Sequence, residues 1–151
     1  MVASTDIKYF SSINSGAPQL TGGEWGQIIS ILDACLVNGF GSKQIQSMTA
    51  DEKIVTVNFN ENHGYLLFQV IKITGANQTE FNGEHRIISL TQTAIQFKIA
   101  SNASVSLATG TLVASLASAG WDKAFSAQGR AAYQPVNSGI DDPLFFVLSM
   151  N

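Results

Sequence analysis

The chain has 151 residues, of which 45% are hydrophobic and 13% are charged, and its formal net charge is −3. This length suits one domain with its own core, and the charged fraction lies below the roughly 25% of typical soluble domains. The eight lysine and arginine residues are scattered, whereas a surface that binds nucleic acid needs them clustered. We therefore expect no nucleic-acid partner.

The chain carries no signal for a membrane or for secretion. Residues 1–6 have neither a basic flank nor an apolar run, and the apolar segments are short. The single cysteine, Cys35, cannot form an intrachain disulfide, which is typical of a reducing cytoplasm. Its apolar neighbours favour a buried structural residue over a catalytic thiol. We expect no membrane partner.

An N-terminal arm and one helix are predicted first. Residues 1–20 form the arm, with an irregular Ser/Gly/Pro stretch from Ser11 to Pro18. Thr21 is a suitable helix N-cap, and Glu24 three residues later completes a capping box. Asn38-Gly39 should end the helix with a left-handed residue. Apolar residues recur at helical spacing, namely Trp25, Ile28, Ile29, Leu32, Cys35 and Leu36.

From Gln44 onward the apolar residues alternate with a period of two, which predicts short strands separated by turns. The predicted strands are Ile54–Phe59, Leu67–Ile73, Arg86–Leu90, Ala94–Ile99 and Gly110–Leu116. Ala100–Thr109 is predicted to be a long surface loop. The fold class is therefore mainly β, a small antiparallel β-barrel or sandwich preceded by one α-helix, with extended N- and C-terminal arms.

The C-terminal tail shows little periodicity until Leu144–Leu148, a final apolar strand that follows Asp141-Asp142-Pro143. Such a strand must pair within its own domain or with another subunit. We divide the chain into residues 1–43, the arm and helix; 44–117, a small β-barrel domain; and 118–151, a C-terminal arm and strand that pack on the helix or on a neighbour.

Catalytic chemistry has little support in the sequence. His63 and His85 lack metal-ligand spacing, and we predict that they are exposed at a turn and a strand start. The adjacent Asp141 and Asp142 would point to opposite faces of an extended strand, so a turn before Pro143 explains them better. We expect no catalytic residue, no cofactor and no metal, and hence no enzyme.

Aromatic residues near both ends of the chain are the candidates for partner binding. Large aromatics outside regular elements anchor an arm either on its own domain or on a partner, and aromatic side chains dominate interface hot spots. Both alternatives stay open at this point. The candidates are Tyr9, Phe10, Trp121, Phe125, Tyr133, Phe145 and Phe146.

Several segments resemble the virion structural proteins of tailed bacteriophages, over roughly Ile7 to Gln134. The residues that carry the resemblance are Ile7–Phe10, Gly16–Pro18, Leu20, Ile31–Gly41, Asn62–Tyr65, Phe81–Glu84, Gly120–Phe125 and Arg130–Tyr133. Gln44–Leu116 is also similar to the small β-barrel insert of phage proteins and of ubiquitin-activating enzymes.

The resemblance implies a non-enzymatic structural component of the virion, as a head decoration or minor capsid protein or as a tail or baseplate protein, assembled in the host cytoplasm. Its partners would be other virion proteins and copies of itself, held by repeated interfaces. The alternative is a module of a phage adhesion apparatus that binds a host-surface glycan or protein through Ala100–Thr109 and the Asn/Thr-rich turns.

Overall fold

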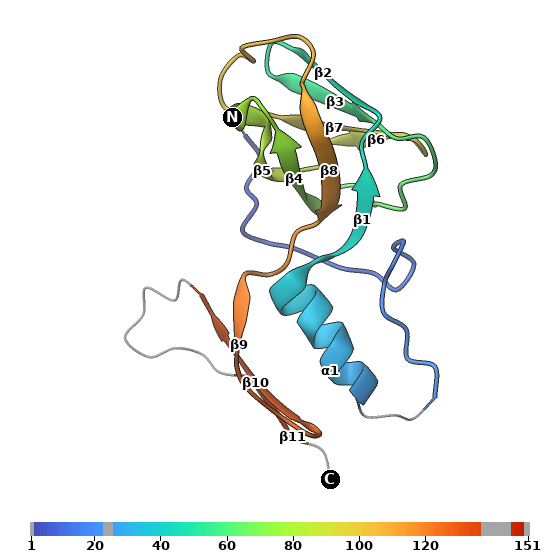
Figure 1. The fold of residues 1–151 in the computed structure, drawn as a ribbon, viewed down its shortest axis with the longest axis vertical. Helices are drawn as coiled ribbons and strands as arrows, with labels where there is room; N and C mark the ends of the chain where they lie inside the picture. The colour runs from blue at the N-terminus through green and yellow to red at the C-terminus, as the bar shows by residue number, and fades with distance from the viewer. Residues whose placement is uncertain (1, 23–25, 137–145, 150–151) are drawn as a thin grey trace.

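The structure is a computed structural model that describes residues 2–22, 26–136 and 146–149. One helix precedes a body of antiparallel strands, which confirms the predicted fold class. The barrel forms one end of the molecule, and the helix with a second, three-stranded sheet forms the other (Figure 1). The arm, residues 2–20, has no regular structure and passes from the barrel towards the helix.

The helix α1 covers Gly26–Leu32 and continues as a π-helical segment, η1, over Asp33–Asn38. Glu24 of the predicted capping box lies outside the described residues. Gly39 follows the helix as predicted, but its φ of 73° and ψ of 174° differ from the left-handed helical conformation. A Cβ on Gly39 would lie 2.2 Å from the Leu116 carbonyl oxygen, so the chain needs glycine at this crossing.

The barrel consists of two four-stranded sheets in which all neighbouring strands are antiparallel. One sheet has the order β1 (Phe40–Gln44), β8 (Gly110–Leu116), β4 (Val70–Ala76) and β5 (Gly83–Arg86). The other has the order β2 (Ser47–Asp51), β3 (Ile54–Asn58), β7 (Ala94–Lys98) and β6 (Ser89–Leu90).

Two corners join these sheets into a closed barrel. Between β1 and β2, the Ile45 amide donates to Leu112 O (3.0 Å) in one sheet, and the Gln46 amide donates to Asn58 O (2.9 Å) in the other. Ile87 and Ile88 change sheets between β5 and β6 in the same way. Hydrogen bonds therefore link the strands of residues 40–117, all of which the structure describes, into a closed ring.

The barrel core explains which strands the sequence predicts well. Buried and half-buried residues alternate along β3 and β7, and β8 continues the pattern. The fully buried side chains of the core include Met48, Val55, Val57, Ile71, Ile73, Phe81, Ile87, Ile95, Phe97 and Ala114. Apolar burial of this kind is the main stabilising contribution to a domain of this size.

One predicted strand began too early. Leu67 and Phe68 are exposed in a turn before β4, and Phe68 has a positive φ of 66°. Arg86, predicted in a strand with Leu90, instead ends β5 and pairs with Val70 of β4. The predicted loop Ala100–Thr109 is confirmed, with one isolated bridge from Leu107 to Thr49 of β2.

The tail contains more regular structure than predicted. β9 (Trp121–Ala127) and β10 (Arg130–Pro135) form an antiparallel hairpin, and β11 (Phe146–Ser149) pairs with β10. The sheet has the order β11-β10-β9, so the final strand finds its partner within its own chain. Leu144 and Asp141-Asp142-Pro143 lie outside the described residues.

Candidate interaction surfaces

The two histidines are buried, which corrects the prediction that they are exposed. His63 is 2% exposed: its Nδ1 accepts a hydrogen bond from the Tyr65 amide (2.9 Å), and its Nε2 lies 2.6 Å from Thr91 O. An accepting Nδ1 requires the neutral ring with its proton on Nε2. Burial lowers the pKa of His63 below its ordinary value.

His85 is also buried and hydrogen-bonded to the backbone. Its ring stacks on Phe97 with centroids 4.0 Å apart, and its Nε2 lies 2.9 Å from Phe81 O. Burial lowers the pKa of His85 as well. In the part of the chain that the structure describes, no three His, Cys, Asp or Glu side chains gather in a way that could hold a metal ion. Both histidines therefore have a structural explanation.

A buried pair of amide side chains fixes the arm on the barrel. Asn14 Nδ2 donates to Gln69 Oε1, and Gln69 Nε2 donates to Asn14 Oδ1, each over 2.8 Å. Asn14 also donates to Gly64 O (2.9 Å), and Gln69 to Tyr9 O (3.2 Å). Both side chains are buried, so their polar atoms depend on each other and on neighbouring backbone groups for hydrogen bonds. The middle of the arm is therefore anchored on its own chain.

A second anchor of the arm uses charged side chains of β5. Arg86 Nε donates to Ser4 O (2.5 Å), and its two other nitrogens donate to the carbonyls of Ile7 and Phe68. Lys8 forms an ion pair with Glu84 over 2.8 Å. The guanidinium holds the arm beside residues 66–69, which we call the Phe68 turn.

The Phe68 turn projects two apolar side chains into solvent. Phe68 is 54% exposed and Leu67 is 41% exposed. The Phe68 amide donates to Ile87 O (3.1 Å), its carbonyl accepts from Arg86 Nη1 (2.6 Å), and the Tyr9 hydroxyl donates to Leu67 O. The backbone of this turn is thus held from both sides while its apolar side chains point outward.

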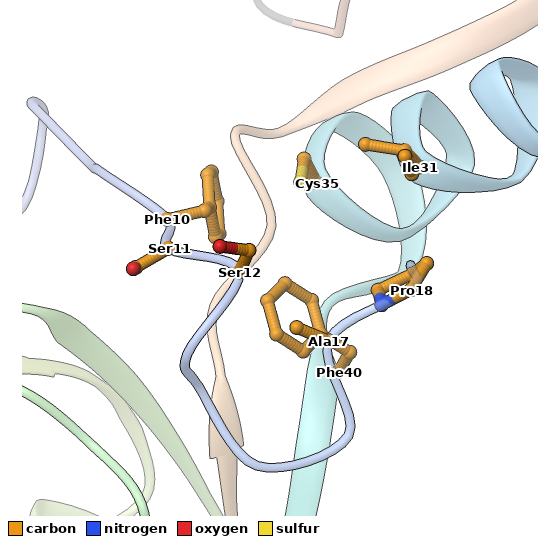
Figure 2. A pocket seen from close by; sticks show the side chains of 8 residues that line it. All are labelled: Phe10, Ser11, Ser12, Ala17, Pro18, Ile31, Cys35 and Phe40. Atoms are coloured by element: carbon orange, nitrogen blue, oxygen red, sulfur yellow. The ribbon is translucent and has the colours of Figure 1, made fainter. Parts of the chain in front are cut away.

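On the other side of the arm, a pocket of about 180 Å³ opens between the arm and the helix (Figure 2). We call it the arm pocket. It is lined by Phe10, Ser11, Ser12, Ala17, Pro18, Ile31, Cys35 and Phe40. The rings of Phe10 and Phe40 lie 5.9 Å apart between centroids. Cys35 is half-buried on its wall, and burial raises the pKa of its thiol, so Cys35 is a poor nucleophile.

The hairpin is attached to the helix by one acidic residue. Asp33 Oδ2 accepts from Lys123 Nζ (3.0 Å), and Asp33 Oδ1 accepts from the Tyr133 hydroxyl (2.7 Å). Burial, together with the neighbouring Asp33 carboxylate, raises the pKa of Tyr133. Asp33 therefore connects the middle of the helix, where α1 passes into η1, to both strands of the hairpin.

The structure distributes the predicted aromatic candidates between the arm and the three-stranded sheet. Tyr9 and Phe125 are exposed; Phe10 and Trp121 are half-buried. Tyr133 is buried against its own helix, where it is unavailable to a partner in this conformation. Phe146 lies in β11, and Phe145 is outside the described residues.

The exposed pair Leu67 and Phe68 was not predicted from the sequence as a candidate for partner binding. The run Tyr65-Leu66-Leu67-Phe68 was a usable signal, because four consecutive large apolar residues cannot all face one core in an alternating strand.

Comparison with protein-family models, with curated proteins and with solved structures finds no match to this chain. Among residues 2–22, 26–136 and 146–149, no helix is both long and apolar enough to cross a membrane.

Proposed function

We propose that the chain is a non-enzymatic structural component of a tailed-phage particle, a head decoration or minor capsid protein or a tail or baseplate protein. It acts through repeated interfaces with copies of itself and with other virion proteins. The observation that carries this proposal is where the exposed apolar side chains lie. Among the described residues, five of these eleven side chains lie in the short arm and two in the hairpin region, namely Val2, Ile7, Tyr9, Ile13, Leu20, Phe125 and Val136; the other four, Leu67, Phe68, Ile88 and Leu107, lie on the much larger barrel.

The barrel itself suits a rigid support. Its strands pair all the way round, and every buried side-chain nitrogen or oxygen among the described residues has a hydrogen-bond partner. A closed ring of strands leaves less sheet edge for unwanted pairing than two open sheets would. Contacts to neighbours then fall on the arm, the Phe68 turn and the hairpin, where weak interfaces repeated by symmetry become strong together.

The test is the composition of purified particles. Mass spectrometry of particles from the virus that encodes the chain should detect it in a fixed ratio to the major capsid or tail protein. A map of the particle from electron microscopy should then contain the barrel at a repeated position. Absence of the chain from particles that are complete by microscopy would contradict the proposal.

One observation favours the alternative function, a glycan-binding module. A shallow depression of about 720 Å³ on the barrel is lined by Thr49, Ala50, Asp51, Ile54, Thr56, Gln96, Ser106 and Leu107. Hydroxyl and amide groups of this kind recognise sugars, and two of the residues belong to the loop Ala100–Thr109. Against this reading, Gln96 Nε2 already donates to Thr56 Oγ1 (3.0 Å).

A glycan array probed with the whole chain distinguishes the two functions. Saturable binding that Gln96→Ala abolishes, without a change in the circular dichroism spectrum, would support the adhesion role. Lys98→Ala provides a control on the same strand, because Lys98 does not line the depression.

A further inference from the structure

Phe68 combines two unfavourable features. Its φ of 66° lies in the left-handed region, which costs a bulky L-residue on the order of 1–2 kcal/mol. More than half of its aromatic side chain also stays in water, where burial would have been favourable. Glycine or asparagine would fit this turn at lower cost. An outlier held in place by its surroundings indicates a functional position.

The surroundings hold the turn firmly. The amide and the carbonyl of Phe68 bind Ile87 and Arg86 respectively, and the Gln69 amide closes the turn onto Leu66 O (3.2 Å). Arg86 is in turn satisfied by carbonyls of the arm. The aromatic ring is therefore presented on a preorganised backbone, which lowers the entropic cost of inserting it into a partner.

The arm pocket matches such a ring in size and character. Its volume is about 180 Å³, and a cavity of roughly 150 Å³ lined by apolar side chains accepts a benzene molecule. Aromatic and aliphatic side chains dominate its lining (Figure 2), and the two hydroxyl-bearing residues of the lining, Ser11 and Ser12, are uncharged. A phenyl ring enters without the desolvation of a charge.

We propose that Phe68 of one copy of the chain inserts into the arm pocket of a second copy. The inference deepens the proposed function, on which it rests, by naming one of the repeated interfaces. Tyr9 contacts the Phe68 turn, and its neighbour Phe10 lines the arm pocket, so the two halves of the interface lie on either side of one short arm segment. A head-to-tail contact leaves each pair with one unused ring and one unused pocket, so it continues into a ring or a filament.

The exposed area indicates how strong one contact is. Phe68 exposes roughly 100 Å², taking about 200 Å² for a whole aromatic side chain. With Ile7, Tyr9 and Leu67 around it, the apolar patch is on the order of 400 Å², about half of one partner's share in a standard interface. A single contact is therefore weak. The interface suits a chain that associates measurably only at high concentration or within a particle that repeats the contact.

The test measures self-association of the whole chain by sedimentation velocity from micromolar to millimolar concentration. The wild type should associate as its concentration rises. Phe68→Gly should associate roughly 30-fold or more weakly, the effect of losing an aromatic hot spot. A residue with only a structural role would change the unfolding temperature and leave self-association of the folded chain unchanged.

Mixing two variants that each keep one side of the interface tests whether the arm pocket is the site that receives Phe68. Ala17→Phe should fill the pocket from within its own chain and also prevent self-association, and Ser12→Trp at the exposed mouth replaces it if Ala17→Phe does not fold. Phe68→Gly keeps the pocket, and the filled variant keeps the ring. An equimolar mixture should therefore form a one-to-one heterodimer that does not grow further.

Two control variants separate the exposure of Phe68 from its positive φ. Leu107→Asn removes an apolar side chain of the same 54% exposure beside β2, and should leave association unchanged. Glu52→Gly relieves the other positive φ of a non-glycine residue, 53°, and should raise the unfolding temperature alone.

A monomeric wild type at millimolar concentration would overturn the inference, as would a mixture of two folded variants that yields no heterodimer. A chain that is present in particles but monomeric in solution would refute this interface and leave the proposed function standing. A self-associating chain that is absent from particles would refute the proposed function and leave this interface standing.

Discussion

At the scale of single residues, the polar groups inside the barrel are the most informative. His63 and His85 are held neutral, and Asn14 and Gln69 satisfy each other across the boundary between arm and barrel. These roles do not follow from local sequence alone, because His63 also contacts Thr91, His85 stacks on Phe97, and Asn14 and Gln69 are 55 residues apart along the chain. A histidine between Asn62 and Gly64 has the sequence context of a surface turn, and only the closure of the barrel buries it.

The histidines predict acid sensitivity. Burial lowers the pKa of each folded-state imidazole, while the unfolded chain keeps values near 6.5. Below that pH the unfolded state binds more protons, so the free energy of unfolding falls as the pH falls from about 6.5 towards the lowered pKa values. Urea unfolding at about pH 7.5 and 5.5 measures this loss. His63→Gln with His85→Gln should reduce the difference between the two pH values, and an equal difference would contradict the assignment.

The amide pair predicts strong energetic coupling. Asn14→Ala or Gln69→Ala removes the side-chain partner of a buried amide, which keeps only its backbone partners, and should destabilise the protein by about 1–3 kcal/mol. The double variant should cost clearly less than the sum, because both members of the pair are then gone. Chemical unfolding of all four proteins gives the coupling energy. Asn60→Ala, which removes an exposed amide from the barrel, is the control and should change stability little.

At the scale of elements, predictability follows apolar periodicity. β3, β7 and β8 carry the alternating pattern, and the sequence locates them closely. β1 has the sequence Phe-Gly-Ser-Lys-Gln and shows no such alternation; it is a strand because β8 pairs with it. The β9–β10 hairpin was missed for a related reason. A bulge between Ala132 and Tyr133 shifts its register and interrupts the period of two.

The junction between helix and barrel predicts a large effect of one methyl group. Gly39→Ala would place a Cβ 2.2 Å from Leu116 O at a positive φ, so the helix end must move away from β8. We expect a loss of more than about 2 kcal/mol in the free energy of unfolding. Gly26→Ala is the matched control, since a Cβ there meets no atom within 4 Å and alanine favours the helix by up to about 1 kcal/mol. Thermal unfolding of both variants decides the matter.

Asp33 predicts a local effect that leaves the barrel intact. Asp33→Asn removes the charge opposite Lys123 and weakens the acceptor of the Tyr133 hydroxyl. Hydrogen exchange should speed up in β9 and β10 and stay unchanged in β3 and β7, with a stability loss of about 1 kcal/mol. Asp122→Asn changes the exposed acid next to Lys123 and should leave exchange in the hairpin as it was. Faster exchange throughout the molecule would show instead that Asp33 supports the whole fold.

At the scale of the whole molecule, a closed barrel stands beside a smaller unit of helix and hairpin, and the arm crosses between them (Figure 1). Composition and turn spacing were sufficient to predict the class of fold. They could not locate the exposed ring or the arm pocket, because both arise where segments distant in sequence meet.

The proposed contact between Phe68 of one copy and the arm pocket of a second copy is uncharged, and this predicts how self-association responds to salt. Neither Phe68 nor the lining of the arm pocket carries a charge. Raising the salt concentration from about 0.05 M to about 1 M screens charge pairs but should leave self-association equally strong or slightly stronger. Sedimentation velocity at both salt concentrations measures this. Dissociation in salt would show that ion pairs hold the copies together.

Arg86 holds the arm through main-chain atoms. The oxygens that it binds belong to the peptide groups of Ser4 and Ile7 in the arm and of Phe68 in the Phe68 turn. Every amino acid supplies such an oxygen. The side chains of Ser4 and Ile7 can therefore be exchanged while Arg86 still holds the arm, and the fold can present a new outward surface to a new neighbour at little cost in stability.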